Sequence, residues 1–365
     1  MTVTVLHVAQ PTEAGVARYV LGACRHQRAH GWRVTTACPD GGGLAAALRR
    51  AGVPRLRWAA TRGPGPASLG EIARLRALIR TVRPDVVHLH ASKAGLAGRL
   101  WPTAGVPVLF QPHGWSWLAV DGPLRWACVR WERFAAHRTD LLICVGDGEA
   151  EQGRAAGIAG RCTVVRNGVD LERFQPANAA ERFAARTRLG VPIDVPLAVC
   201  PGRLTRQKGQ DVLLEAWPAV RAVCPRAGLA VVGEGDLGPR LRAGNTPGVS
   251  FAGAVEDVRD WLAAADVVVL PSRWEGLSLV LLEAMATGRS VVASDVPGLR
   301  EALLPGAGAQ VPPDDPQALA EALSRRLLDP AACEAEGEQG ARHAAQFDLR
   351  RTYEQLTART EEVLR

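Results

Sequence analysis

Residues 266–295 read DVVVLPSRWEGLSLVLLEAMATGRSVVASD, a strand-like run, a helical run and a second strand-like run. The apolar segments 266–272 and 290–295 are typical of buried strands in a parallel sheet. Ser278 can cap the helix between them at its start, and Gly288 suits its end. This order predicts a parallel β–α–β unit, whose first loop lies at the carboxyl edge of the sheet.

The same rhythm continues in both directions along the chain. Strand-like and helical segments alternate from the N-terminus, loosen over 171–195 and then restart. This pattern predicts an α/β chain of two doubly wound domains, an N-terminal domain at 1–180 and a C-terminal domain at 181–345. Residues 346–365 are expected to form a terminal helix that packs back on the N-terminal domain. Two such domains normally bind a ligand in the cleft between them.

The composition excludes disordered, fibrous and membrane-spanning proteins. Of the 365 residues, 47% are hydrophobic and 22% are charged, and no apolar run approaches the roughly 18 residues of a membrane span. The eight cysteines are scattered without the spacing of a zinc site, which indicates free thiols. The N-terminus resembles a first strand rather than a signal peptide. We therefore expect a cytoplasmic protein.

The net charge of +7 favours an anionic partner. Only Lys93 and Lys208 are lysines among the 44 basic residues, and a compact ammonium can suit a tight phosphate pocket better than a guanidinium does. Lys208 lies with Arg203 in GRLTRQKG at 202–209, directly after a strand. The two side chains are therefore candidates for neutralising a diphosphate leaving group; the alternative is an ordinary basic loop.

Two glutamates flank the start of the helix in the opening segment. Glu275 lies in the loop before it and Glu283 lies inside it, so that the two carboxylates can hold different hydroxyl groups. The free N–H groups at the helix start favour an anion. A sugar nucleotide supplies both kinds of group. The alternative is a surface glutamate together with a helical glutamate paired with an arginine.

Seven segments form a combination that is more specific than any one of them. They are GRLTRQKG (202–209), VVGEGDLGPRL (231–241), FAGAVEDV (251–258), PSRWEGLSLVLLEAMATGRSVVASDVPGLRE (271–301), EAGVARYV (13–20), FQPHGW (110–115) and VVRNGVDLERF (164–174). The combination covers most of the chain and resembles the retaining glycosyltransferases of family 4. The resemblance implies the GT-B fold, in which two Rossmann-like domains face each other across a cleft. It also implies hexose transfer from a nucleotide-diphosphate donor, with UDP favoured, to a hydroxyl acceptor.

The resemblance assigns roles to individual residues. It implies that Arg203 and Lys208 bind the donor diphosphate, that Glu283 binds the ribose, and that His113 lies beside the anomeric centre as a catalytic residue together with Glu275. The contacts to the donor sugar are assigned to Glu275, Gly276 and Leu277.

The first loop shows the main departure from the family. Gly15 is expected to approach the phosphates closely, but the family often has a glycine pair where this chain has Ala14-Gly15. The acceptor side is assigned to Arg18, His90 and Lys93. For the strand that carries His88 and His90, the alternative is an ordinary, satisfied strand end.

The implied reaction retains the anomeric configuration and needs neither a metal ion nor another cofactor. No DxD motif of the metal-holding kind is present, and Asp314-Asp315 lies in a proline-rich turn. The acceptor hydroxyl attacks from the face that the nucleoside diphosphate leaves and gives its proton to the departing phosphate. The acceptor stays open between a lipid-linked saccharide of cell-surface polysaccharide synthesis and a small secondary metabolite. No nucleic-acid partner is expected.

Three other functions are alternatives to glycosyl transfer. Gly233, Gly235 and Gly238 spell G-x-G-x-x-G, but Glu234 and Asp236 between them would repel a dinucleotide pyrophosphate, which disfavours a dehydrogenase. A nucleotide-sugar epimerase on the same fold and a non-catalytic nucleotide-sugar-binding protein remain as alternatives.

A segment rich in tryptophan and arginine spans 114–134. Such a segment suits an anionic lipid surface, and hence a protein that contacts the inner face of a membrane peripherally. The favoured interpretation is a core helix that buries Leu124, Cys128 and Trp131 and leaves its arginines in water.

Overall fold

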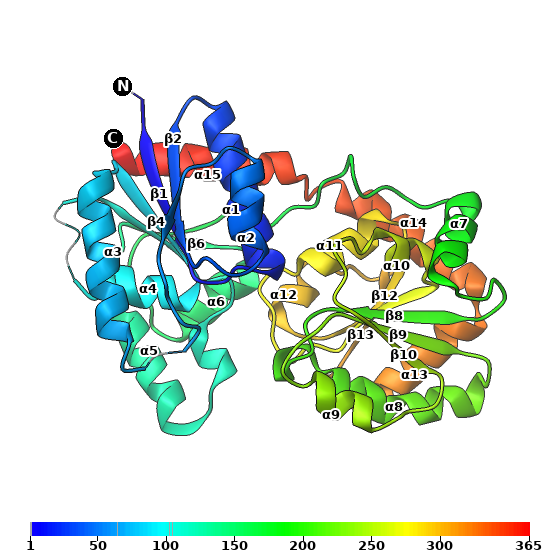
Figure 1. Cartoon of the computed structure of the whole chain (residues 1–365). Helices are drawn as coiled ribbons and strands as arrows, with labels where there is room; N and C mark the ends of the chain where they lie inside the picture. The colour runs from blue at the N-terminus through cyan, green and yellow to red at the C-terminus, as the bar shows by residue number, and fades with distance from the viewer. Residues whose placement is uncertain (1, 64, 102, 104) are drawn as a thin grey trace. The chain divides into compact units, whose positions relative to one another are not determined.

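The computed structural model describes residues 2–63, 65–101, 103 and 105–365, and the chain divides into two compact units (Figure 1). Unit 1 consists of Met1–Arg166 and Arg350–Arg365, and unit 2 of Asn167–Leu349. Each unit has its own parallel sheet with helices on both faces, which confirms the α/β, doubly wound class predicted from the alternating pattern.

The sheet of unit 1 has seven strands in the order β3-β2-β1-β4-β5-β6-β7. The chain moves outward from β1 in one direction and from β4 in the other, so the topological switch point lies between these two strands. The loops that follow them are the places where a doubly wound sheet binds ligands. The strands are β1 (Thr4–Ala9), β2 (Arg33–Cys38), β3 (Arg55–Arg57), β4 (Val86–His90), β5 (Val108–Gln111), β6 (Leu141–Cys144) and β7 (Cys162–Val164).

Helices cover both faces of this sheet. α1 and α15 lie on one face, and α3 and α4 lie on the other (Figure 1). A Cβ on Gly22 of α1 would lie 2.0 Å from the hydroxyl oxygen of Tyr353, so only glycine lets α15 pack this closely on α1. The helices are α1 (Ala14–Ala29), α2 (Gly43–Arg50), α3 (Ser68–Val82), α4 (Ala91–Arg99), η1 (Ser116–Ala119), α5 (Gly122–Ala136), α6 (Asp147–Ala155) and α15 (Leu349–Leu364).

The sheet of unit 2 has six strands in the order β10-β9-β8-β11-β12-β13. Its switch point lies between β8 and β11, which places the loops after these strands at the ligand-binding edge. The strands are β8 (Leu197–Pro201), β9 (Gly228–Val232), β10 (Val249–Gly253), β11 (Val267–Leu270), β12 (Ser290–Ser294) and β13 (Gly308–Val311).

In unit 2, α8, α9 and α13 cover one face of the sheet, and α7, α10, α11 and α14 cover the other (Figure 1). Trp217 of α8 is fully buried in the core beneath the sheet. The helices are α7 (Ala179–Leu189), η2 (Arg206–Lys208), α8 (Gln210–Val223), α9 (Gly238–Ala243), α10 (Arg259–Ala264), α11 (Leu279–Ala286), α12 (Pro297–Arg300), α13 (Pro316–Leu328) and α14 (Pro330–Ala344).

Residues 171–195, where strands and helices alternate less regularly in the sequence, contain α7. A buried arginine holds this helix to the sheet. Asn178 and Glu181 form a reciprocal capping box at the start of the helix. Arg186 is fully buried; its guanidinium donates to the carbonyl oxygen of Ala264 at 2.9 Å and to the carboxylate of Asp266 at 2.9 Å. These bonds satisfy the buried charge and fix α7 beside α10.

The prediction of a buried α5 is wrong in part. Cys128 and Trp131 are half-buried, but Leu124 is 52% exposed, and the helix also exposes Trp126 (65%) and Phe134 (50%). α5 therefore presents apolar side chains to solvent between its arginines. Among the residues that the structure describes, no helix combines the length and the apolar character that crossing a membrane requires.

Candidate active site

The loop between β8 and α8 lies at the switch point of unit 2. Gly209 has a φ of 65°, and a Cβ there would lie 1.9 Å from the carbonyl oxygen of Pro271. Only glycine therefore permits this loop to pack directly on the residue that follows β11. The close approach places Lys208, the last residue of η2, beside the loop that carries Glu275.

Lys208 and Glu275 form an ion pair with 2.5 Å between Nζ and Oε1. The lysine side chain is 15% exposed and the glutamate side chain 8%. The same carboxylate oxygen accepts a hydrogen bond from the Ser272 hydroxyl at 2.8 Å, and Gln207 Nε2 lies 3.5 Å from the other oxygen. The contacts orient Glu275 and fix one ammonium group at the carboxyl edge of the sheet.

Arg273 holds the two loops together. Its guanidinium contacts the carboxylate of Asp211 at 2.8 Å and that of Asp314 at 2.6 Å, and it donates to the carbonyl oxygen of Arg206 at 2.8 Å. The hydrogen bonds and negative charge of Asp211 and Asp314 stabilise the charged guanidinium and raise its pKa. The loops that carry Lys208 and Glu275 are therefore braced against each other.

The helix that follows Glu275 starts at the same edge. The hydroxyl of Ser278 accepts a long hydrogen bond, 3.5 Å, from the backbone N–H of Leu281, which confirms the predicted capping position. Glu283 lies in the second turn of α11 and is 4% exposed. A Cβ on Gly298 would lie 1.9 Å from the carbonyl oxygen of Gly276, so α12 packs directly on the backbone of this loop.

The remaining donor-site candidates lie near this ion pair in the chain. Leu277 is 2% exposed, and its carbonyl oxygen accepts a hydrogen bond of 2.7 Å from the Asn167 amide. Arg203 is half-buried, and its carbonyl oxygen accepts from the Gln210 amide at 3.0 Å. All of the predicted residues of unit 2 thus follow β8 or β11, the two strands at the switch point.

The glycines of the G-x-G-x-x-G pattern support the same loop. A Cβ on Gly233 would lie 2.1 Å from the carbonyl oxygen of Gly202, and a Cβ on Gly235 would lie 2.2 Å from that of Leu204. These glycines let the loop after β9 pack on the loop that carries Arg203. Their role in packing accounts for the pattern without a dinucleotide.

The first loop of unit 1 contains a left-handed alanine. Ala14 has a φ of 59°, a conformation that favours glycine and that costs other residues about 1–2 kcal/mol. The backbone at this position therefore suits the glycine that the resemblance implies, and this chain has alanine there. Gly15 follows as the second residue of α1 and is half-buried, and Arg18, one turn later, is exposed.

His113 follows β5 in a strained turn. It has a φ of 53° and is followed by Gly114 with a φ of 99°. The carboxylate of Glu149 accepts hydrogen bonds from the backbone N–H of Gly114 at 2.5 Å and from that of Val145 at 2.8 Å. Glu149, on α6, therefore fixes the turn that positions His113.

A row of hydrogen-bonded imidazoles leads from His113 into the core. His113 Nε2 lies 3.1 Å from His90 Nδ1, and His90 Nε2 lies 2.9 Å from His7 Nδ1. His7 Nε2 lies 2.7 Å from the Gln27 amide oxygen. The imidazole of His88 lies beside the row, with its ring centre 4.0 Å from that of His90.

Burial keeps these imidazoles neutral. It lowers the pKa of His7 to about 4 and that of His113 to about 3. Burial and the neighbouring imidazoles hold the pKa values of His88 and His90 well below the ordinary value. The side chain of His113 therefore acts as a neutral hydrogen-bonding group and not as a cation.

Lys93 forms a buried ion pair in unit 1. Its ammonium lies 2.6 Å from the Glu71 carboxylate, with both side chains 5% exposed, and donates to the carbonyl oxygen of Gly63 at 2.9 Å and to the Ser68 hydroxyl at 3.0 Å. These contacts join α4 to the start of α3. The geometry thus gives Lys93 a structural function, and its predicted place on the acceptor side stays a prediction.

Several residues of the site were not identified from the sequence. Ser272 lies three residues before Glu275, and its proximity in the chain was a usable signal. His7, Gln27 and Glu149 gave no such signal, because they reach His90 and His113 only through the order of strands in the sheet.

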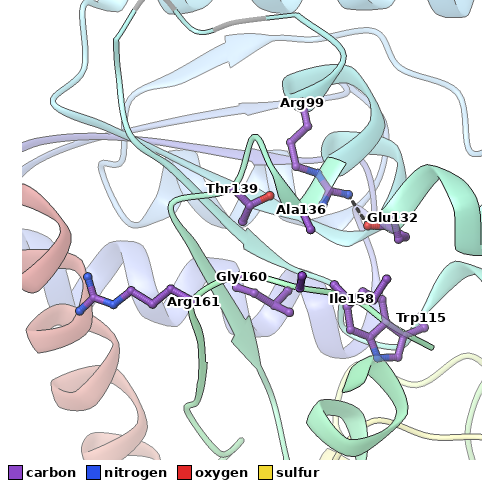
Figure 2. A pocket seen from close by; sticks show the side chains of 10 residues that line it. Arg99, Trp115, Glu132, Ala136, Thr139, Ile158, Gly160 and Arg161 are labelled. Carbon is purple, nitrogen blue, oxygen red and sulfur yellow. Dashed lines mark hydrogen bonds and ion pairs between the residues drawn. The ribbon is translucent and has the colours of Figure 1, made fainter. Parts of the chain in front are cut away.

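A small pocket of unit 1 lies elsewhere and holds another buried ion pair. Figure 2 shows Arg99 and Glu132 pointing toward each other in it, with 2.7 Å between guanidinium and carboxylate. The guanidinium also lies over the ring of Phe110, 3.6 Å from its centre. Because both charges are buried and paired with each other, we interpret this pocket as a structural feature that joins α4 to α5.

Comparison with known proteins decides the family. Residues 14–173 match the family described as Glycosyltransferase Family 4, and residues 195–329 match Glycosyl transferases group 1. The D-inositol 3-phosphate glycosyltransferase of Thermobispora bispora is 33% identical over 308 residues, which cover 76% of this chain and 71% of that protein. The chain belongs to the family 4 glycosyltransferases.

Further relatives agree with this family. A GDP-mannose-dependent monoacylated alpha-(1-6)-phosphatidylinositol monomannoside mannosyltransferase of Corynebacterium glutamicum is 38% identical over 189 residues; the match spans 48% of this glycosyltransferase and only half of that protein. The structure of Anabaena HepE, solved with UDP and glucose, superposes with a TM-score of 0.82 at 21% identity and covers 98% of this chain and 99% of that one. Structural likeness at this identity shows the fold, and it confirms the GT-B fold expected from the motifs.

Proposed function

We propose that this glycosyltransferase moves a hexose from a nucleoside diphosphate, UDP in the first instance, to a hydroxyl acceptor, with retention of the anomeric configuration and without a metal ion. The observation that supports the proposal is the Lys208–Glu275 pair, in which a cation lies 2.5 Å from a carboxylate oxygen. Both groups lie at the switch point of the unit 2 sheet, where doubly wound domains bind nucleotides.

In this proposal the residues predicted for the donor site keep the roles that the resemblance implies. Lys208 and Arg203 bind the diphosphate, and Glu283 binds the ribose hydroxyls. Glu275 and the backbone that follows it bind the sugar hydroxyls, with Gly276 and Leu277 supplying N–H groups near the start of α11. Gly15 permits close approach to the phosphates, and His113 contacts the transferred sugar. The pair of cations takes over the charge that a metal ion would otherwise neutralise.

The proposed transfer needs no separate base, because the departing phosphate takes the proton of the acceptor hydroxyl. The bond from the anomeric carbon to the β-phosphate oxygen breaks, and the sugar acquires oxocarbenium character. The acceptor oxygen bonds to the same face, and its proton passes to the departing phosphate oxygen. The positive charges near the diphosphate stabilise this leaving group as its negative charge grows. Asp314 is engaged by Arg273 and Asp315 caps α13, so neither aspartate of this pair is placed to recruit a metal.

A set of nucleotide sugars, each offered as the donor, tests the proposal. The full-length protein is incubated with UDP-glucose, UDP-N-acetylglucosamine or GDP-mannose and simple alkyl acceptors, with and without EDTA; the GDP sugar is included because the Corynebacterium relative is GDP-mannose-dependent by name. We expect acceptor-dependent release of the nucleoside diphosphate, an α-linked product by NMR from an α-linked donor, and no loss of rate with EDTA. An inverted product, or loss of activity that added Mg²⁺ or Mn²⁺ restores, would contradict the proposal. Sugar isomerisation without acceptor would favour an epimerase.

The exposed face of α5 favours a lipid-linked acceptor. Trp126 and Phe134 are exposed by half or more, and Arg130 and Arg138 lie over their rings at 4.9 Å and 4.7 Å from the ring centres. Aromatic side chains among arginines bind the interface of an anionic membrane. The Corynebacterium relative acts, by its name, on a phosphatidylinositol mannoside. We therefore include a peripheral membrane contact and a lipid-linked saccharide acceptor in the proposal.

Vesicle binding tests this surface. The protein is expected to co-sediment with vesicles of equal parts phosphatidylglycerol and phosphatidylcholine and not with phosphatidylcholine alone. Replacing Arg125, Arg130 and Arg133 by glutamine should weaken binding about a hundredfold, because each basic residue near such a surface contributes about 1 kcal/mol. The control replaces three exposed arginines of α3, Arg74, Arg76 and Arg80, by glutamine, which removes the same charge from another surface of unit 1. Equal binding of the arginine variant and the wild type would show that α5 does not contact the membrane.

A further inference from the structure

The imidazole row ends on the side-chain amide of a buried glutamine. Gln27 lies on α1 and is 1% exposed, and its oxygen lies 2.7 Å from Nε2 of the fully buried His7. His7 lies on β1 and His90 on β4, the two strands at the switch point of unit 1, while His113 follows β5. Three hydrogen bonds therefore connect a helix on one face of the sheet with the strained turn at its carboxyl edge.

We propose that Gln27 sets the tautomer of His113 through His7 and His90, so that His113 carries its proton on Nε2 and offers Nδ1 as a hydrogen-bond acceptor. Gln27, His7 and His90 are then positioning residues for the transfer reaction. The inference rests on the proposed function for the contact between His113 and the sugar, whereas the tautomer itself is a property of unit 1.

The donors and acceptors in the row fix the position of each proton. An amide oxygen only accepts, so the proton of His7 must lie on Nε2, and its Nδ1 is an acceptor. That nitrogen can accept only from His90 Nε2–H, which leaves His90 Nδ1 bare. His90 Nδ1 accepts in turn from His113 Nε2–H at 3.1 Å. Every bond in the row has one donor and one acceptor only when the three rings share this tautomer.

The neutral state of the rings is required and is favoured by burial. A protonated His7 would donate from both ring nitrogens and would reverse the donor order at His90 and His113, so the proposed tautomer holds only while the rings are neutral. Burial lowers the pKa of His7 and of His113 far enough that both stay neutral at physiological pH. In a buried row of neutral rings, the tautomer that Gln27 selects at His7 determines the tautomers of His90 and His113 without any change of charge.

The consequence for function is a choice of hydrogen-bond direction. With Nδ1 bare, His113 can accept a hydrogen bond from a sugar hydroxyl, whose own oxygen then stays free to accept from another donor. With the proton on Nδ1, the same side chain would donate and would compete with the backbone N–H groups assigned to the sugar. The row therefore fits His113 as an acceptor that discriminates the orientation of a hydroxyl group.

The same histidines also offer an alternative as metal ligands. His7, His88 and His90 could each direct one nitrogen to a common point, because these atoms lie within 4.8 Å of one another. Both nitrogens of His7 and of His90 are, however, engaged in the row, and no carboxylate is among the three side chains. A divalent cation would break at least one hydrogen bond of the row and would leave its charge buried among neutral ligands. The geometry favours the tautomer row.

Nuclear magnetic resonance of the full-length wild-type protein, labelled with ¹⁵N-histidine, tests the inference without any variant. We expect His113 to show a protonated-nitrogen shift at Nε2 and an unprotonated one at Nδ1, with a scalar coupling between His113 Nε2 and His90 Nδ1 across the hydrogen bond. A proton on Nδ1 of His113 would overturn the inference. So would ring shifts that change when one equivalent of Zn²⁺ is added, because the rings would then be metal ligands.

A matched pair of variants tests whether Gln27 controls the tautomer. Gln27→Leu removes the acceptor and should give His113 a mixture of tautomers, with kcat lowered about tenfold and the affinity for UDP unchanged within twofold. His88→Leu removes a buried imidazole outside the row and should leave the tautomer of His113 unchanged. An unaltered tautomer in folded Gln27→Leu would overturn the inference. A shifted tautomer with unchanged kcat would support the row and would instead contradict the proposed contact of His113 with the sugar.

Discussion

Replacing Lys208 by alanine should lower kcat/KM for sugar transfer about a thousandfold. The variant loses a charge that stabilises the leaving diphosphate, an effect of about 10²–10³ for one preorganised group. It also leaves Glu275, whose side chain is 8% exposed, without the cation that lies 2.5 Å away. A buried carboxylate without its partner is destabilised and free to reorient, which adds to the loss. Initial rates with the preferred donor measure the effect.

The other lysine of the chain provides the control. Lys93→Ala breaks a buried pair with Glu71 and should lower the free energy of unfolding while leaving the affinity for UDP unchanged. Lys208→Arg should restore only part of the activity, because the planar guanidinium cannot reproduce the compact contact with the Glu275 carboxylate. A Lys208→Ala enzyme that keeps a tenth of the wild-type activity would rule out a central role for this lysine.

Acidification from pH 7.5 to pH 5 should destabilise the protein strongly, because unit 1 buries neutral histidines. In the unfolded chain a histidine has a pKa of about 6.5 and is protonated at pH 5. The folded protein keeps His7 neutral, since burial lowers its pKa to about 4. The unfolded state therefore binds more protons below pH 6.5, and the free energy of unfolding falls as the pH falls. His7 alone accounts for about 2 kcal/mol at pH 5, and His88 and His90 act in the same direction.

Calorimetry checks this prediction in two ways. The unfolding transition should move down by at least about 5 °C between pH 7.5 and pH 5, and it should be insensitive to these groups above pH 7. Unfolding at pH 5.5, measured in buffers of different ionisation enthalpy, should take up at least about three protons. An uptake of less than one proton would mean that the buried imidazoles are already charged, and the neutral row would then be untenable.

Much of the fold could be predicted because its signals are local. The segment 266–295 contains β11, α11 and β12 in the predicted order, and Ser278 caps α11 as expected. Glycines and capping residues act on their immediate neighbours, so their positions in the chain suffice. The proximity of Lys208 and Glu275 was also accessible, since both follow strands that meet at a switch point.

The histidine row could not be predicted in the same way. His7 and His90 are 83 residues apart and become neighbours only because β1 and β4 pair in the sheet. The order of strands depends on the whole sheet and cannot be read from one segment. Gln27 contacts His7 because α1 packs against the sheet beside β1. The carboxylate of Glu149 reaches Gly114 for a similar reason, across 35 residues.

The helix α5 shows a different limit. Its sequence pattern is compatible with a buried apolar face. Leu124 and Trp126 are exposed because no other element of unit 1 among the described residues buries them. Periodicity identifies an amphipathic helix, but it does not say whether its apolar side faces a core or another surface. Ala14 is a related case, because the backbone needs a left-handed residue that the chain fills with alanine.

Calorimetric titration with UDP and with uridine measures whether Lys208 and Arg203 hold the donor diphosphate, as we propose. Wild-type protein should bind UDP far more tightly than uridine. Lys208→Ala should bind UDP about a hundredfold more weakly, in line with the loss of one charge-assisted contact, with its affinity for uridine unchanged. Equal UDP affinities in the two proteins would contradict the account, because the diphosphate would then be bound elsewhere.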